Sequence, residues 1–163
     1  AVTFPSGRYI IDNNPGSLGG WKSDPVVIES NNQVVFKMGS TYTYGENHAR
    51  HRQYFVAFNP EQLEFAVNSA DTIICEDTLS VVHLFKPEDI IDRNSRWRRG
   101  ENIMLSFYQE GFCGPEIALN RNVSNSFLGV RRVQDQDTLY GWINLDIIDN
   151  REIFLGEYYL HRN

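Results

Sequence analysis

Short runs of β-branched and aromatic residues recur along the whole chain, separated by clusters of Asn, Asp, Gly, Ser and Pro. Such runs suit the pleated, half-buried surface of a sheet, and the polar clusters supply the residues that turns require. We therefore expect an all-β fold, an antiparallel β-sandwich of about nine or ten strands with one candidate for a short helix. The expected strands are Arg8–Asp12, Val26–Glu29, Gln33–Met38, Gln53–Phe58, Leu63–Val67, Leu79–Phe85, Ile103–Gln109, Phe127–Val133, Tyr140–Ile148 and Ile153–Leu160.

The segment Asn59–Val67 fits two different structures. Asn59 is a good N-cap, Pro60 suits the first helical position, and the apolar residues that follow have helical spacing. The runs YFVAF and LEFAV, however, flank Asn59–Gln62 almost as mirror images, and Pro60 also suits a type I turn. We favour a hairpin here, with the helix as the alternative.

Two further clusters of turn residues predict hairpins, at Ser30–Asn32 and at Asp149–Arg151. Asn and Asp tolerate the left-handed backbone conformation that tight hairpins need. The polar stretch Gly39–Arg52 is expected to be a loop.

The composition is that of an ordinary globular protein. The chain has 163 residues, which predicts a single domain over residues 1–163. The formal net charge of −6 disfavours nucleic acid as a partner, because a phosphate-binding surface needs an excess of basic residues. No apolar run approaches the roughly 18 residues that a membrane-spanning helix needs, so no transmembrane segment is expected.

The two cysteines, Cys75 and Cys113, are too far apart in sequence for a CxxC motif, and two thiols alone make a poor metal site. A disulfide between them is the economical interpretation if the protein is exported, and two reduced thiols are the alternative if it is cytosolic. The first residues, Ala1–Pro5, lack the charged and apolar segments of a signal peptide. Either the protein is cytosolic or a leader has been removed.

The sequence carries no recognisable motif for catalysis or for cofactor binding. GxSxG, GxGxxG and GxxxxGK(S/T) do not occur, which disfavours a nucleophile elbow and the common nucleotide-binding loops. His48 and His51 have HxxH spacing, but no third ligand is evident, so we predict no metal and no cofactor. Carboxylates are abundant, and the sequence leaves open whether two of them face each other as in a glycosidase.

The loop NSRWRRG, residues 94–100, is the most suggestive binding segment. Arg96 and Arg98 flank Trp97, and a guanidinium stacked on an indole can form a platform for anionic or sugar ligands. Tyr42 and Tyr44 can add aromatic surface for a carbohydrate. The alternative for Trp97 is a packing role, in which the indole plugs the sandwich.

The run YGWINLDII, residues 140–148, predicts a strand with two unlike faces. Trp142 lies on the mixed face, where we expect it to cover a cross-strand neighbour rather than to contact a ligand. The opposite face should point into the core, because it carries the apolar row Gly141, Ile143, Leu145 and Ile147.

The C-terminal part of the chain resembles a group of exported bacterial proteins. The runs FLGVR (residues 127–131) and YGWINL (residues 140–145) are similar to the closing strands of β-rich proteins that are often surface lipoproteins of Gram-negative species. The run LFKPEDIIDRNSRW (residues 84–97) is similar to another of their segments, with Glu88 in place of the usual Gly. The resemblance covers the chain from Leu84 to its end.

The resemblance implies a β-rich protein that is secreted, periplasmic or anchored to the outer membrane after removal of its leader. It implies no activity and no catalytic residue. We therefore expect a non-enzymatic surface binding or structural module, whose partner is a glycan or another surface protein. A carbohydrate-binding or glycoside hydrolase-like domain is the first alternative, and an inhibitor-type partner protein is the second.

Overall fold

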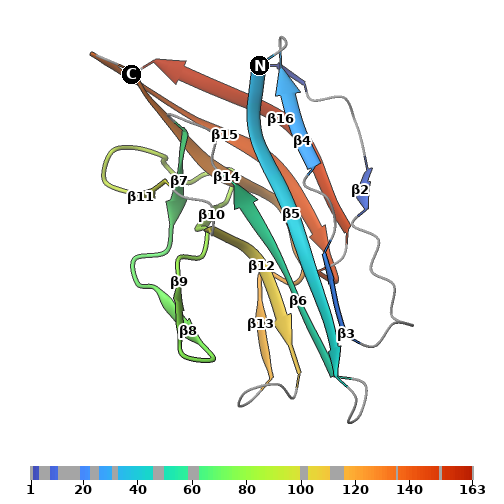
Figure 1. The fold of residues 1–163 in the computed structure, drawn as a ribbon. Coiled ribbons are helices and arrows are strands. Elements are labelled where there is room, and N and C mark those ends of the chain that lie inside the picture. The colour runs from blue at the N-terminus through green and yellow to red at the C-terminus, as the bar shows by residue number, and fades with distance from the viewer. Residues whose placement is uncertain are drawn as a thin grey trace.

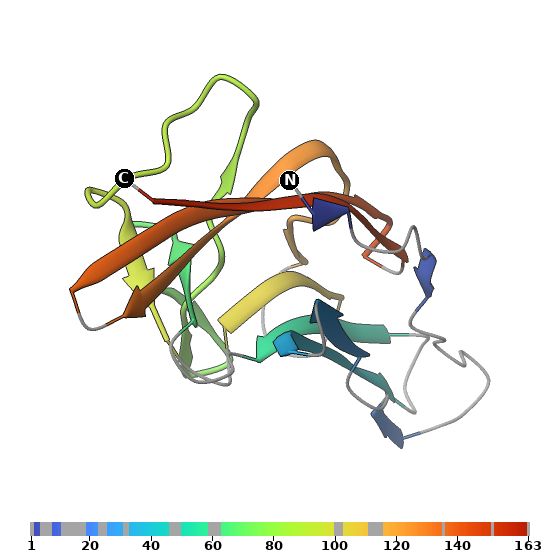
Figure 2. The same cartoon turned by 90° about the horizontal axis from the view of Figure 1, so that it is seen from above.

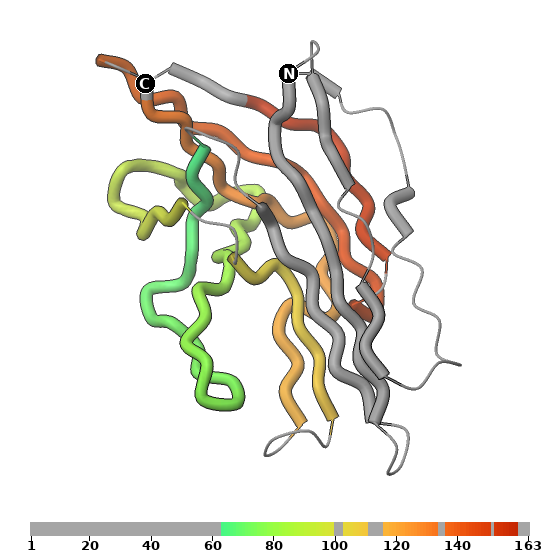
Figure 3. Tube along the Cα trace, viewed as in Figure 1, coloured from blue at the N-terminus to red at the C-terminus, as the bar shows by residue number. Residues whose placement is uncertain are grey.

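A computed structural model describes the backbone of residues 2–3, 8–10, 19–22, 26–30, 33–45, 50–58, 63–99, 103–110, 116–134, 136–150 and 152–162. Side chains are described for residues 63–99, 103–110, 116–133, 136–150 and 152–159 (Figure 3). Within these ranges the chain forms strands and turns and no helix, so the predicted short helix is not found there.

The larger sheet has eight strands in the order β1-β16-β15-β14-β7-β11, with β10 paired to β14 and β2 paired to β16. Every pairing in it is antiparallel. Its long strands are β14 (Val123–Gln134), β15 (Asp137–Ile148) and β16 (Glu152–Arg162). Its short strands are β1 (Val2–Thr3), β2 (Arg8–Ile10), β7 (Leu63–Val67), β10 (Leu84–Phe85) and β11 (Arg96–Arg98).

The smaller sheet has six strands in the order β13-β12-β6-β5-β3, with β4 paired to β5, and its pairings are also antiparallel. A separate two-stranded hairpin is formed by β8 (Thr72–Ile74) and β9 (Asp77–Leu79). The strands of the smaller sheet are β3 (Gly19–Lys22), β4 (Val26–Ser30), β5 (Gln33–Gly45), β6 (Arg50–Phe58), β12 (Ile103–Gln109) and β13 (Ile117–Leu119).

The two sheets form two layers, with the long strands β14 to β16 in one layer and β5, β6 and β12 in the other (Figures 1 and 2). Side chains of both layers meet in one core cluster, to which the larger sheet contributes Phe65 and Ile143 and the smaller sheet contributes Ile103 and Leu105. All four are at most 3% exposed. The fold is therefore an all-β antiparallel sandwich, as the sequence predicts.

The predicted facing of β15 is confirmed. Ile143, Leu145 and Ile147 are each at most 1% exposed, whereas Trp142 on the other face is half-buried. Alternation along the strand thus gives the larger sheet an apolar inner face and a mixed outer face.

Two of the predicted hairpins are confirmed. Ser30 pairs with Gln33 across the β4–β5 turn, and Ile148 pairs with Glu152 across the β15–β16 turn. Asp149 and Asn150 have φ values of 52° and 56°, in the left-handed region that Asp and Asn tolerate.

The predicted hairpin at Asn59–Gln62 is wrong. Leu63–Val67 is the strand β7, as predicted, but β7 pairs with β14 and β11, while β6 pairs with β5 and β12. The chain thus crosses from the smaller to the larger sheet between them. Two similar apolar runs indicate two strands, but they carry no information about which partner each strand takes. Residues 59–62 lie outside the described residues.

Two other expectations are also wrong. The predicted loop Gly39–Arg52 is mostly strand, because β5 continues to Gly45 and pairs there with Arg50 of β6. The predicted strand Leu79–Phe85 is broken, because Val81 bridges Met104 of the smaller sheet while Val82 bridges Val67 of the larger one. Neighbouring residues that bond to different sheets do not extend one ladder.

No helix in the described part of the chain is long and apolar enough to cross a membrane.

Candidate binding face

The outer face of the larger sheet gathers five half-buried aromatic side chains, which we call the aromatic face: Trp97, Phe127, Tyr140, Trp142 and Tyr159. They come from four strands, β11, β14, β15 and β16. Register places them together: Trp142 pairs with Gly129 on one side and Tyr159 on the other. Tyr140 is two residues before Trp142 on the same strand and therefore shares its face.

Trp97 contacts β15 across the sheet. Its ring centroid lies 5.7 Å from that of Tyr140 in an edge-on arrangement. The Arg131 guanidinium carbon lies 5.0 Å from the centroid of the Trp97 ring. The indole nitrogen donates a hydrogen bond of 3.1 Å to the carbonyl of Asp92. The hydrogen bond of the indole nitrogen and the contacts of the ring with Tyr140 and Arg131 therefore fix the orientation of Trp97.

Trp142 is the centre of the second aromatic group. Phe127 meets it edge-on with centroids 5.2 Å apart. Tyr159 lies 6.1 Å away with 29° between the ring planes, so these two rings are nearly parallel. Trp142 covers its cross-strand neighbours, as the sequence predicts, and remains half-buried. These contacts agree with the predicted packing, whereas the prediction that Trp142 does not contact a ligand is not tested by them.

Polar groups border the aromatic face on both sides. Arg131 pairs with Glu64, and its Nε lies 2.6 Å from Glu64 Oε2. Their side chains are 21% and 17% exposed, so the pair is shielded but reached by solvent. Beyond Trp142, Asn144 donates from Nδ2 to Asn125 Oδ1 at 3.1 Å and to the Ser126 carbonyl at 3.3 Å. Hydrogen-bonding groups thus lie beside the stacked rings at either end.

The predicted trio of Arg96, Trp97 and Arg98 is not one surface. The segment is the edge strand β11 rather than a loop, so alternate residues point to opposite faces of the sheet. Both arginines are therefore on the other face from Trp97. The guanidinium that stacks on Trp97 belongs to Arg131 instead. The charged residues of this segment suggest a loop, but charged residues are also common on edge strands, where they prevent pairing with another chain.

Arg96 forms its own ion pair on the other side of the strand. Its Nη1 lies 2.9 Å from Asp71 Oδ1 and donates to the Asn68 carbonyl at 3.1 Å. The pKa of the Asp71 carboxyl is lowered, first by this hydrogen bond, then by the Ser80 hydroxyl at 3.0 Å, and further by the charges of Arg96 and Arg98. Arg96 therefore anchors β11 to the loop that follows β7.

Tyr42 and Tyr44 belong to a different sheet from Trp97. Both lie on β5, where Tyr42 pairs with Trp21 and Tyr44 with Gly19 of β3. Their side chains, like that of His48, lie outside the described residues. The structure thus brings neither tyrosine to the aromatic face through strand pairing.

Cys75 lies in the turn between β8 and β9 with a φ of 52°. It packs against a second core cluster around Met104 and Phe107, and its Sγ is 3.6 Å from Gln109 Oε1. No cysteine in the described part of the chain is a free thiol. Cys113 lies outside the described residues, so its pairing with Cys75 stays a prediction.

Within the described residues, no group of three or more His, Cys, Asp and Glu side chains could hold a metal ion. The aromatic face itself offers rings, one shielded ion pair and amide groups, which suit binding by stacking and hydrogen bonding.

The sequence contains a signal for this face, although the signal is not a recognised motif. Tyr140 and Trp142 are separated by one residue, so any strand through them places two large rings on the same side. Arg131 and Phe127 have the same spacing relative to Gly129. The two pairs of residues come together because β14 and β15 are neighbouring strands. The order of the strands is known from the fold and not from the spacing in the sequence.

No family model matches the chain, and neither a curated protein nor a solved structure is significantly similar to it.

Proposed function

We propose that this protein is an exported, non-enzymatic β-sandwich that binds a glycan on the aromatic face. The observation that carries the proposal is a row of half-buried rings on the solvent side of the larger sheet, in which Trp97 contacts Tyr140 and Trp142 contacts Tyr159. Aromatic side chains that gather on one exposed face commonly mark an interaction site.

The chemistry of the face suits a sugar chain. A pyranose ring presents C–H groups on its flat side, which stack on an aromatic ring, and hydroxyls on its edge. Trp and Tyr offer broad, rigid contact surfaces with a polar tip. The Arg131–Glu64 pair at one end and Asn144 at the other offer donors and acceptors to hydroxyls. Rings that lie along several neighbouring strands suit an extended saccharide better than a compact one.

A glycan array tests this proposal. The wild-type protein should bind a defined class of polysaccharide, and Trp97→Ala and Trp142→Ala should each reduce that signal. Ile73→Ala is the matched control, because Ile73 is 71% exposed on β8, outside the aromatic face. A silent array with folded wild-type protein, or a signal that both tryptophan variants retain, would contradict the proposal.

Enzymatic turnover is the competing alternative. Prolonged incubation of each bound glycan with the protein, followed by analysis of its chain length, should show no cleavage. If the glycan is shortened, the protein is a glycoside hydrolase-like enzyme and not a binding module.

Export is the second part of the proposal and rests on the resemblance of FLGVR and YGWINL to exported proteins. An exported chain should carry a Cys75–Cys113 disulfide, because oxidising compartments favour such bonds. Thiol counting in denaturant should find no reactive thiol before reduction and two after it. Two reactive thiols in protein purified without reductant, from its native compartment, would contradict both the disulfide and export.

A further inference from the structure

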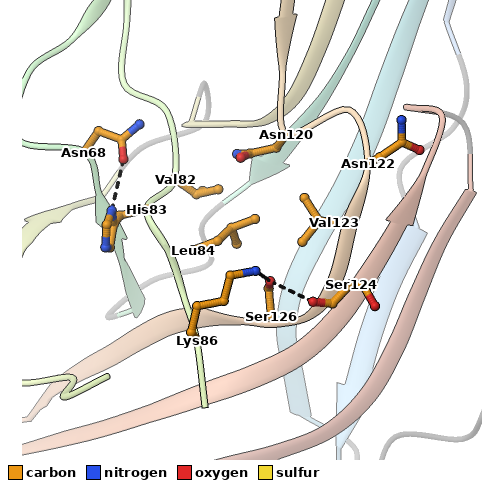
Figure 4. Close-up of a pocket in the computed structure, with 10 residues that line it drawn as sticks. All are labelled: Asn68, Val82, His83, Leu84, Lys86, Asn120, Asn122, Val123, Ser124 and Ser126. Atoms are coloured by element: carbon orange, nitrogen blue, oxygen red, sulfur yellow. Dashed lines mark hydrogen bonds between the residues drawn. The ribbon is translucent and has the colours of Figure 1, made fainter. Parts of the chain in front are cut away.

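A pocket of about 350 Å³ opens on the other side of β14 from the aromatic face (Figure 4). It lies between the segment Val82–Lys86, which includes β10, and the segment Asn120–Ser126, which leads into β14. Asn68, just after β7, closes one side. Its volume is at the small end of the roughly 300–1,000 Å³ range of ligand pockets.

The floor of the pocket is aliphatic. Val82 is 1% exposed and belongs to the main core cluster, and Leu84 and Val123 pack against that cluster. Figure 4 shows these three side chains in the middle of the pocket, with polar side chains around them. An apolar floor inside a polar ring favours a ligand with a compact hydrocarbon part.

One wall carries a cation anchored to a buried hydroxyl. Lys86 Nζ donates to Ser126 Oγ at 3.0 Å, and Ser126 is fully buried. Ser126 Oγ in turn donates to the Ser124 carbonyl at 3.2 Å. An ammonium has three donors, so two remain for a ligand after the bond to Ser126.

Other polar side chains line the pocket on two further sides, with Asn68 and His83 on one and Asn122 on the other (Figure 4). His83 Nδ1 lies 3.1 Å from Asn68 Oδ1, which orients the imidazole. Asn122 Oδ1 accepts the Asp149 amide at 2.8 Å, so its Nδ2 is left as a donor for the pocket. The pocket therefore offers donors from two sides.

The charge of the pocket is one-sided. In the described part of the chain, no carboxylate lines the pocket and no acidic side chain forms an ion pair with the Lys86 ammonium. Asp89 accepts the backbone amide of Lys86 at 2.8 Å and is not a lining residue. Lys86 therefore presents a positive charge to the pocket on a chain whose net charge is −6.

We propose that this pocket binds a small organic anion, with its carboxylate on Lys86 and its hydrocarbon part on Val82, Leu84 and Val123. Charge-assisted hydrogen bonds from the ammonium fix the anionic group, and the aliphatic floor selects for an apolar body. The site is separate from the aromatic face, so it goes beyond glycan binding and does not depend on it.

Titration followed by amide NMR tests the pocket, with isobutyrate, isobutyramide and inorganic phosphate as probes. Isobutyrate should shift the amides of residues 82–86 and 120–126 in a saturable way. Isobutyramide, its neutral isostere, should bind at least about tenfold more weakly because it lacks the charge. Phosphate should also bind more weakly, because it gains nothing from the aliphatic floor.

Lys86→Met keeps much of the aliphatic stem and should weaken isobutyrate binding at least about tenfold. Arg93→Gln is the matched control, because it removes a positive charge from the same exposed loop outside the pocket and should leave binding unchanged. The proposal is overturned if isobutyrate gives no saturable shift, if isobutyramide or phosphate binds as tightly, or if Lys86→Met binds like the wild type with its spectrum otherwise intact.

Discussion

Gly129 lies where the neighbouring strands of the larger sheet leave no room for a side chain. A Cβ at this position would lie 2.8 Å from Phe85 Cε2 and 3.0 Å from Ala66 Cβ. Both neighbours are at most 5% exposed, so neither can move away freely. The glycine of the run FLGVR thus lets Phe85 pack over β14 on the same side of the sheet as the aromatic face.

Gly129→Ala should therefore destabilise the protein by about 1–3 kcal/mol, the usual cost of overpacking a core. Gly156→Ala is the comparison: its Cβ would meet Asn144 Oδ1 at 2.6 Å, at the end of a half-buried side chain that can move at the cost of its hydrogen bonds to Asn125 and Ser126. Urea unfolding should show a clearly smaller loss for Gly156→Ala. Phe85→Leu should restore part of the stability of Gly129→Ala, and equal losses in both glycine variants would contradict this packing.

Burial along β15 could be predicted from the sequence, whereas the contact between Arg131 and Trp97 could not. The alternation of Gly141, Ile143, Leu145 and Ile147 is a local property, and it correctly gave the buried face of β15. The arginine stacked on Trp97 is a long-range property, because Arg131 and Trp97 meet only through the order of strands β11, β7 and β14. Sequence neighbours of Trp97 were therefore poor guides to its spatial neighbours.

The turn between β15 and β16 links the two sheets. Asn150 is 1% exposed, donates from its backbone amide to the Arg121 carbonyl at 2.8 Å, and hydrogen-bonds through its side chain to the Ser106 hydroxyl of β12. Ser106 Oγ donates onward to the Asn120 carbonyl at 2.9 Å. A hairpin of the larger sheet is thus tied to a central strand of the smaller one.

Asn150→Ala should cost about 2–3 kcal/mol, because it breaks a buried hydrogen bond and places Ala in a left-handed conformation. Asn150→Gly relieves the backbone but still loses the bond to Ser106, so it should keep at least half of that loss. Chemical denaturation of the two variants separates these causes. An Asn150→Gly protein as stable as the wild type would show that this link contributes nothing.

The edge strand β11 depends on the Asp71–Arg96 pair, which predicts a pH dependence. The pKa of Asp71 is lower in the folded protein than its ordinary value, first because Arg96 donates a hydrogen bond to it. Its contribution to stability is therefore fully present above the ordinary carboxyl value of about 3.9 and is lost as pH falls through the lowered pKa.

Asp71→Asn removes this titration, so the variant should be less stable than the wild type at neutral pH and should lose less stability on acidification. Thermal unfolding of both proteins, from neutral pH into the acid range, measures how steeply the unfolding temperature of each changes with pH. Asp77→Asn, at an exposed position on β9, is the control, and parallel curves for wild type and Asp71→Asn would contradict the assignment.

At the scale of elements, the strands with strong apolar runs were the most predictable. Leu63–Val67 and Ile103–Gln109 agree with β7 and β12 at both ends. Pairing was not predictable where the chain changes sheet, as it does between β6 and β7 and again at Val81 and Val82. Apolar alternation records that a residue is buried, whereas partner choice depends on contacts between residues far apart in sequence.

At the scale of the whole molecule, β14 separates two surfaces of different character. Its outer residues Phe127 and Arg131 belong to or border the aromatic face, and its inner residue Ser126 holds the lysine of the small pocket. The sandwich class followed from the spacing of strands and turns. The two surfaces could not be predicted in the same way, because each combines residues from three or more separate segments.

We propose that the aromatic face binds a glycan, and calorimetric titration with the soluble oligosaccharide most strongly bound on the array measures this binding. Trp142→Ala should raise the dissociation constant at least about tenfold, because it removes the central ring of the row. Ile73→Ala, with its side chain 71% exposed on the β8–β9 hairpin, should bind like the wild type. An unchanged dissociation constant for Trp142→Ala, in protein whose unfolding remains cooperative, would contradict the claim.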